Sequence, residues 1–191
     1  MKIGHAKMQA LLLACAIACT GLFAQGFQTS SQAATATEIN TWSQEVLSDF
    51  KAKVPEANNV LIEAKGLLVF PHLYQAGLMV GGKYSVGELL INKVVNGYYN
   101  IAGLSWGWQI GGQREALIIA FMTDDALKKF QNGEGWDIGG DATVAIIAAG
   151  AEGSINASRV NKPVLVFALN QKGLMAGISL QGSKITKVNK K

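Results

Sequence analysis

Cysteine and histidine, on which disulfides and many metal centres depend, are nearly absent from this chain. Its 191 residues include two cysteines, Cys15 and Cys19, and both lie in an apolar N-terminal stretch. After that stretch there is a single histidine, His72, with no second ligand at metal-binding spacing from it. This scarcity excludes a disulfide framework and predicts neither a metal site nor a cofactor, so the core must hold the fold by itself.

Charge is scarce as well. Charged residues make up 16% of the chain and hydrophobic residues 49%, which at this length suits one compact domain with a large core. The formal net charge is +4; without Lys2 and Lys7, 15 basic and 13 acidic residues remain, a net charge of +2. A balance so close to neutral gives no reason to expect nucleic acid as a partner.

The N-terminal stretch has the pattern of an export signal. A short basic region at residues 1–7 precedes the apolar residues 8–27. Small residues suited to cleavage follow at Ser31-Gln32-Ala33 and at Ala34-Thr35-Ala36.

We therefore expect residues 1–36 to be a signal peptide and residues 37–191 to form one domain. The expected location is the periplasm or the outer membrane. A lipid anchor on Cys15 or Cys19 is the alternative to plain cleavage, because each cysteine follows a short apolar triplet.

Hydrophobic spacing divides the rest of the chain into a helical beginning and a β-rich remainder. Residues 37–54 place apolar side chains at helical spacing, and a second helix is expected after Pro55. From Gly66 onward, short β-prone runs alternate with glycines, and one helix with a Thr cap and a glycine stop interrupts them at residues 123–133. These patterns predict an α+β fold with a largely antiparallel, curled or barrel-like sheet, N-terminal helices and one helix inserted between strands.

Two glycine motifs resemble catalytic signatures, but each lacks a residue that the chemistry requires at another position. Gly103-Leu104-Ser105-Trp106-Gly107 fits the serine-hydrolase pattern, but the required histidine must follow the serine and His72 precedes it. The segment from Gly77 to Lys83 fits the core of a phosphate loop, but Tyr84 stands where Ser or Thr must bind magnesium. The chain is therefore predicted not to be an enzyme.

Because side chains alternate between the two faces of a strand, the first of these motifs predicts a strand with bulky side chains on one face and mainly glycines on the other, which we call the bare face. Gly103, Gly107 and Gly111 fall on the bare face, and Leu104 and Trp106 fall on the other. A bare face lets another backbone, a helix or a ligand come close, so these glycines are predicted to be structural.

Six segments, taken together in chain order, resemble one family. They are AKGLLVFP (64–71), AGLMVGGKYSVGELL (76–90), GYYNIAGLSWGWQIGGQ (97–113), FMTDDALKKF (121–130), GWDIGGDATVAI (135–146) and NQKGLMAGISLQGSKITKV (170–188). This set is similar to the SYLF domain, a lipid-binding domain also described from a fungal endocytic actin-binding protein. The chain resembles the exported bacterial branch, in which the domain stands alone.

The resemblance implies membrane-lipid binding, with phosphoinositides preferred by eukaryotic members, through an amphipathic N-terminal helix and basic residues. The candidates for membrane contact on the helix are Trp42, Phe50, Lys51 and Lys53. The candidates for contact with lipid or phosphate are Lys65, Lys83, Lys93, Arg114, Lys184 and Lys187.

The predicted function is therefore that of a non-enzymatic envelope protein that binds anionic lipid or another phosphate-bearing ligand. The alternative is a structural or protein-interaction module of the envelope. Two features favour that alternative: the family includes actin binders, and the bare strand face suits close packing against a protein partner.

Overall fold

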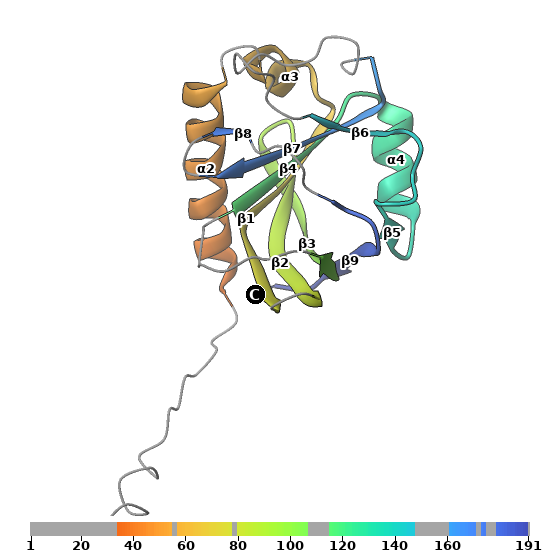
Figure 1. Cartoon of the computed structure of the whole chain (residues 1–191). Helices are drawn as coiled ribbons and strands as arrows, with labels where there is room; N and C mark the ends of the chain where they lie inside the picture. The colour runs from red at the N-terminus through yellow and green to blue at the C-terminus, as the bar shows by residue number, and fades with distance from the viewer. Residues whose placement is uncertain are drawn as a thin grey trace, which may run out of the picture. The chain divides into compact units, whose positions relative to one another are not determined.

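A computed structural model describes residues 34–54, 57–77, 80–106, 115–147, 161–170, 173–174 and 179–190 of the chain (Figure 1). Several residues named in the sequence analysis lie outside these ranges. Among them are Cys15, Cys19, Gly107, Gly111 and Arg114.

Helix α2, Ala36–Lys53, begins with a complete capping box. The Thr35 hydroxyl accepts a hydrogen bond from the Glu38 backbone N–H at 3.3 Å, and the Glu38 carboxylate accepts one from the Thr35 backbone N–H at 2.8 Å. Both bonds satisfy N–H groups that the start of a helix leaves without partners. Of the two cleavage positions expected from the sequence, the one after residue 33 would leave this cap intact and the one after residue 36 would remove it.

Two shorter helices follow in the chain. Helix α3 is Ala57–Glu63, and helix α4 is Asp124–Asn132. The Thr123 hydroxyl caps the start of α4 by accepting a bond from the Ala126 N–H at 3.3 Å, and Gly133 ends it, as the sequence predicts for the inserted helix. Among the described residues, no helix is both long enough and apolar enough to cross a membrane.

The described strands form one nine-stranded sheet in the order β5-β9-β3-β2-β1-β4-β7-β6, with β8 paired to β7. Strands β6 and β7 run parallel, whereas every other described pair is antiparallel, which confirms the predicted α+β fold. The strands are β1 (Gly66–Gly77), β2 (Val80–Ile91), β3 (Val94–Trp106), β4 (Glu115–Phe121), β5 (Trp136–Asp137), β6 (Val144–Ile147), β7 (Val164–Asn170), β8 (Gly173–Leu174) and β9 (Ser183–Val188).

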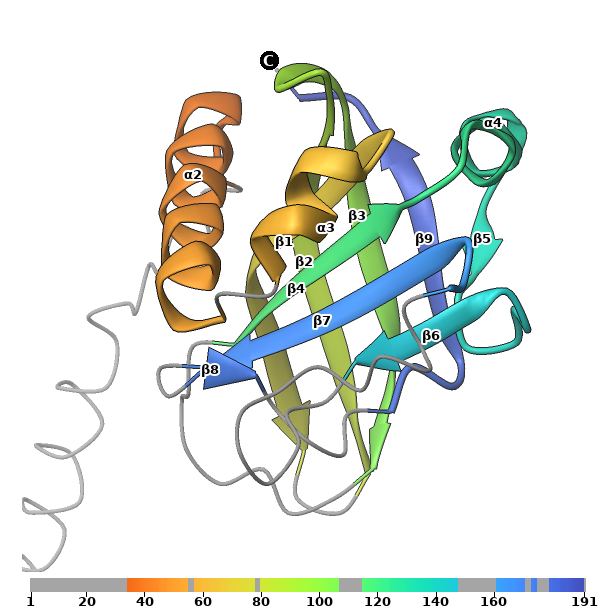
Figure 2. The same cartoon turned by 90° about the horizontal axis from the view of Figure 1, so that it is seen from above.

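Helices cover both faces of the curled sheet, with α4 on one side and α2 on the other (Figures 1 and 2). On the inner face, Leu127 and Phe130 of α4 pack in a cluster with Leu68 and Phe70 of β1. On the outer face, Phe50 of α2 belongs to a second cluster, which also contains Val60 of α3 and strand residues such as Val69 and Phe167. Strand β4 lies between the two clusters, and all of its residues are therefore buried.

At Gly103, another backbone comes close to the glycine strand. Gly103 pairs with Ser183 of β9, and a Cβ added at Gly103 would lie 2.7 Å from both the Ser183 Cα and the Gly182 carbonyl oxygen. Carbon atoms do not approach so closely without strain, so the position requires glycine.

Candidate functional site

A groove of about 570 Å³ lies between α2, α3 and the turn that joins β2 to β3. We call it the basic groove, because two of the predicted contact residues, Lys51 of α2 and Lys93 of the turn, both line it. The other lining residues divide into apolar side chains and short polar ones. They are Leu47, Leu61, Ile62, Ala64, Leu67 and Leu90, with Gln44, Ser48 and Asn92.

The turn that presents Lys93 is built from two residues, Asn92 and Lys93, with φ angles of 51° and 65°. Positive φ at both central residues is the pattern of a type I′ hairpin turn, which matches the twist of the strands it connects. Asparagine adopts this conformation more easily than most residues, so Asn92 favours the turn. The exposed Lys93 side chain is therefore carried on a short, well-defined connection rather than on a long loop.

An exposed apolar side chain accompanies the two lysines. Ile62 of α3 lines the groove and is 73% exposed, whereas Leu47 and Leu90 inside the groove are buried. Apolar side chains next to a basic rim form a surface that can enter the boundary region of a bilayer, while ammonium groups meet anionic headgroups.

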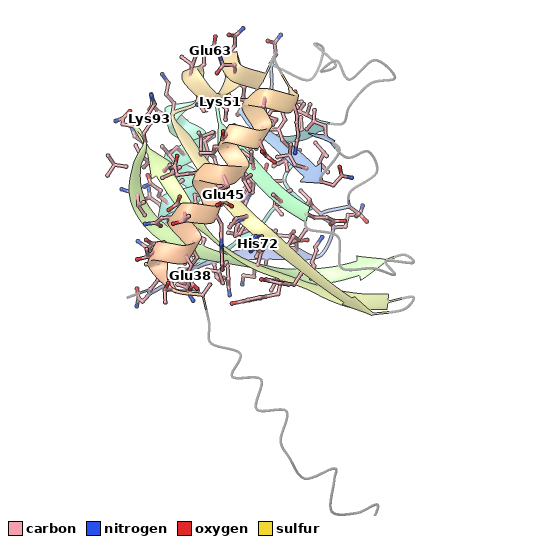
Figure 3. All side chains as sticks on the ribbon, turned by 90° about the vertical axis from the view of Figure 1, so that its left-hand side faces the viewer. Glu38, Glu45, Lys51, Glu63, His72 and Lys93 are labelled. Atoms are coloured by element: carbon pink, nitrogen blue, oxygen red, sulfur yellow. The ribbon has the colours of Figure 1, made fainter. Side chains whose placement is uncertain are left out.

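Helical spacing separates the two lysines at the end of α2. Lys51 lines the basic groove, whereas Lys53 lies on the other flank of the helix, where its Nζ is 2.7 Å from the Asp49 carboxylate. Figure 3 shows Lys51 and Lys93 on one side of α2 and His72 on the other. Only one of the two predicted helix lysines therefore belongs to the groove.

The other predicted basic residues do not line this groove. Lys65 is exposed just after Ala64, and its backbone N–H donates to the Phe121 carbonyl at 2.8 Å. Lys184 and Lys187 are both exposed on β9, one on each face of that strand because their positions differ by three.

Lys83 has a different environment from the one its sequence position suggested. It is only 4% exposed, and its Nζ donates a hydrogen bond to the Ser179 carbonyl oxygen at 2.6 Å. Burial lowers the pKa of the Lys83 ammonium group. In this fold Lys83 ties β2 to the segment before β9, and it presents no charge to a membrane surface.

The two aromatic residues of α2 also have structural roles. Phe50 is fully buried and packs against Phe167, with ring centroids 4.9 Å apart, so its ring cannot reach a membrane while α2 is docked. Trp42 is half-buried and its ring centroid lies 4.5 Å from that of His72. Only Lys51, of the four helix candidates, lines the basic groove.

A buried polar cluster lies beneath α2, in the middle of its apolar contact with the sheet. Glu88 of β2 is 0% exposed and faces Asn40, Ser43 and Tyr98. With its nitrogen turned inward, the Asn40 amide donates to the Glu88 carboxylate at 2.5 Å and lies 2.9 Å from the Tyr98 hydroxyl oxygen. The reverse orientation would set the amide oxygen against the carboxylate, so it requires a protonated Glu88.

Burial raises the pKa of Glu88, and the nearby Ser43 hydroxyl offsets part of that effect. Within the described part of the chain, neither Ser43 Oγ nor Glu88 Oε1 has a partner in full hydrogen-bond geometry. The cluster therefore opposes docking of α2 when Glu88 is ionised, although the apolar contacts around it favour docking.

Sequence patterns did not reveal the exposed apolar residue beside the lysines. Ile62 is an ordinary member of a helix in the sequence, and its exposure follows only from how that helix packs. The usable signal was the Asn92-Lys93 pair between two apolar runs, which is a hairpin pattern. In the part of the chain that the structure describes, no three His, Cys, Asp or Glu side chains gather as metal ligands do.

The curled sheet is covered by helices and carries a lysine-rimmed apolar groove. The family model of Ysc84, described as "Las17-binding protein actin regulator", matches residues 102–191. Over these residues the chain is similar to the Ysc84 (SYLF) family, so the SYLF resemblance predicted from its motifs is confirmed.

Individual relatives agree with this assignment. The chain is 31% identical over 133 residues to the human SH3 domain-containing YSC84-like protein 1, covering 65% of this chain and 38% of that protein. It is 27% identical over 135 residues to LAS seventeen-binding protein 3 of Saccharomyces cerevisiae, covering 66% of this chain and 29% of that protein. The chain thus spans less than two fifths of these relatives' length, and the name of the yeast relative is that of a binding protein.

Proposed function

We propose that this protein is a non-enzymatic binding protein of the cell envelope that attaches to anionic lipid through the basic groove. The observation that carries the proposal is the meeting of Lys51 and Lys93, far apart in the sequence, at one groove that the exposed Ile62 also lines. Each lysine near an anionic surface contributes about 1 kcal/mol of attraction. The exposed Ile62 side chain adds attraction that salt does not screen.

The test is co-sedimentation of the full chain with phosphatidylserine vesicles and with phosphatidylcholine vesicles at several salt concentrations. All variants keep the same N-terminal segment, so any membrane attraction from that segment is constant among them. Neutralising two lysines with Lys51→Gln and Lys93→Gln removes about 2 kcal/mol of attraction, which is roughly a thirtyfold weaker binding to phosphatidylserine vesicles.

The matched control is the double variant Lys184→Gln and Lys187→Gln, which removes two exposed lysines outside the groove. Its binding is expected to stay within a few-fold of the unmodified chain. Equal losses in the two double variants would contradict the groove as the contact. Displacement of the protein from vesicles by soluble glycerol phosphate would identify a free phosphate compound, rather than a membrane, as the ligand.

Protein binding is the second candidate function. It is favoured by the description of the matching family and by the name of the yeast relative, LAS seventeen-binding protein 3. Loss of vesicle binding in every condition, together with one stoichiometric protein partner, would favour this candidate over the first.

A further inference from the structure

The flank of α2 opposite the basic groove carries a line of aromatic rings. Trp42 of α2 packs on His72 of β1 with ring centroids 4.5 Å apart, and His72 meets Tyr74 edge-on at 6.3 Å. Tyr74 is the direct cross-strand partner of Tyr84 on β2. We call these four residues the aromatic strip. Its two tyrosines are 64% and 48% exposed, so half of the strip faces solvent.

A β-bulge at Pro71 and His72 turns this part of β1 toward the α2 side. Between the pairs Val69–Glu88 and Tyr74–Tyr84, β1 has one residue more than β2. Phe70 and Leu73 consequently both point into the inner core, and His72 and Tyr74 point outward. Without the extra residue, strict alternation would put His72 and Tyr74 on the same face as Phe70. Proline suits such a position because it donates no backbone hydrogen bond.

Beside the strip lies a pocket of about 260 Å³ whose border includes His72, Glu45, Asp49 and Lys53. Glu45 is exposed on α2, one helical turn from Trp42. Asp49 is paired with Lys53, and the Asp49 side chain is still 68% exposed. The pocket therefore places carboxylate acceptors at one end of the aromatic strip. The basic groove on the other flank of α2 has lysines instead.

We propose that the aromatic strip and this pocket together bind an extended segment of a partner protein that carries arginine and proline. An arginine side chain matches the border of the pocket, because its planar guanidinium stacks on aromatic rings and forms paired hydrogen bonds with a carboxylate such as Glu45. Proline residues next to it would lie on the exposed rings of Tyr74 and Tyr84, as they do in aromatic grooves that recognise polyproline helices.

The pairing of β1 argues against another common mode of peptide recognition. From Gly66 to Leu73, β1 pairs with β4 on one edge, and it pairs with β2 on the other. A peptide therefore cannot join β1 there as an added strand, so recognition beside His72 must rest on side chains. This contact is separate from the proposed lipid contact, because Trp42 and Glu45 lie on one flank of α2 and Lys51 on the other.

The test measures the binding of a fluorescein-labelled peptide of about ten residues by fluorescence anisotropy with the full chain. The peptide has proline at every third position and one central arginine, and a second peptide has glutamate in place of that arginine. The arginine peptide is expected to bind, and the glutamate peptide at least tenfold more weakly, because like charges meet at Glu45 and Asp49.

Three variants locate the contact. Glu45→Lys is expected to weaken binding of the arginine peptide at least tenfold, and the double variant Tyr74→Ala and Tyr84→Ala to abolish it within the measurable range. Glu63→Lys makes the same charge change on α3, away from the strip, and should alter binding less than twofold (Figure 3). Melting temperatures check that each variant is folded, which is expected because Glu45, Glu63 and both tyrosines are exposed.

Three results would overturn the inference. They are no binding of the arginine peptide at millimolar concentration, equal binding of the two peptides, and equal effects of Glu45→Lys and Glu63→Lys. Vesicle binding by Glu45→Lys and by the tyrosine double variant separates this inference from the lipid proposal, since it should be unchanged in both. A loss of vesicle binding in the tyrosine double variant, without peptide binding, would assign the strip to the membrane and reject the peptide.

Discussion

The two flanks of helix α2 differ in chemistry although one helix supplies both. One flank opens on the basic groove, with Lys51 and Lys93 over an apolar floor. The other opens on the aromatic strip and its pocket, with Glu45 and Asp49 at the border. Between them, the face of α2 that includes Leu47 and Phe50 is buried against the sheet. Exposed side chains of the helix and the sheet meet only where the buried face of the helix ends. Both candidate binding sites therefore lie along the two borders of that face.

The largest expected effect on both flanks comes from removing the buried side chain that anchors α2 to the sheet. Phe50→Ala deletes a fully buried ring that packs against Phe167, and such truncations cost about 3–5 kcal/mol of folding free energy. Denaturant unfolding should report this loss, and vesicle and peptide binding should both weaken. A change smaller than 1 kcal/mol in the free energy of unfolding would contradict the tight docking of α2.

A sharper test separates the flanks with two lysines from the same turn of the helix. Lys51→Glu should weaken binding to phosphatidylserine vesicles by about 2 kcal/mol, roughly thirtyfold, because one favourable charge becomes an unfavourable one. Lys53→Glu changes the same charge on the other flank, so vesicle binding should hardly change and arginine-peptide binding should strengthen. Co-sedimentation measures vesicle binding, and anisotropy measures peptide binding. An equal loss of vesicle binding in the two variants would contradict the distinction between the flanks.

The buried carboxyl beneath α2 predicts a pH-dependent change in stability. Burial raises the pKa of Glu88 above its ordinary value of 4.5, so the folded state holds the proton more tightly than the unfolded state. Below pH 4.5 the carboxyl is protonated in both states, and Glu88→Gln should have little effect. As pH rises through the folded-state pKa, the unmodified chain loses stability, so Glu88→Gln should be more stable at neutral pH by about 1–2 kcal/mol.

Asp141→Asn is the matched control, because its carboxyl has the opposite shift. Burial acts to raise the pKa of Asp141, but hydrogen bonds from Thr143 and Trp136 and the charge of Lys129 outweigh it and lower the pKa from 3.8 to about 2. Asp141 thus contributes stability above pH 3.8 that is lost as pH falls toward 2. At neutral pH this variant should be less stable, and thermal unfolding over a range of pH values compares the two carboxyls directly.

The smallest expected effect concerns the start of α2. Thr35→Ala removes the hydroxyl that accepts a bond from the Glu38 N–H, and the loss of a helix cap costs about 1 kcal/mol. Hydrogen exchange should increase in the first turn of α2, whereas exchange near Lys51 and Lys93 should remain as it was. Faster exchange at the groove end would show that the two ends of the helix open together.

Several elements were predictable because their signals are local. The Thr123 cap and the Gly133 stop bound helix α4, and the run from Asn170 to Gly173 has a hairpin pattern that fits the pairing of these two residues between β7 and β8. Caps and turn residues act within a few positions, through hydrogen bonds and backbone angles that the neighbours themselves set.

The placement of the candidate contact residues was not predictable in the same way. Lys83 resembled an exposed cation, but the curl of the sheet buries it against the Ser179 carbonyl. Phe50 fitted an amphipathic membrane helix, and the face on which it lies instead belongs to the core. Periodicity identifies an apolar face, but it does not tell whether a sheet or a bilayer covers that face.

Local sequence patterns were enough for the α+β class, the Thr123 cap of α4, and the motifs that make the chain similar to the Ysc84 family. Only the tertiary structure decided that Lys51 and Lys93 share a groove, that Lys53 lies apart from them, and that a bulge turns His72 and Tyr74 toward Trp42. The physical reason is the distance along the chain over which each influence acts. Local propensity specifies each element, whereas the partners of a side chain depend on strand register and on burial among residues distant in the chain.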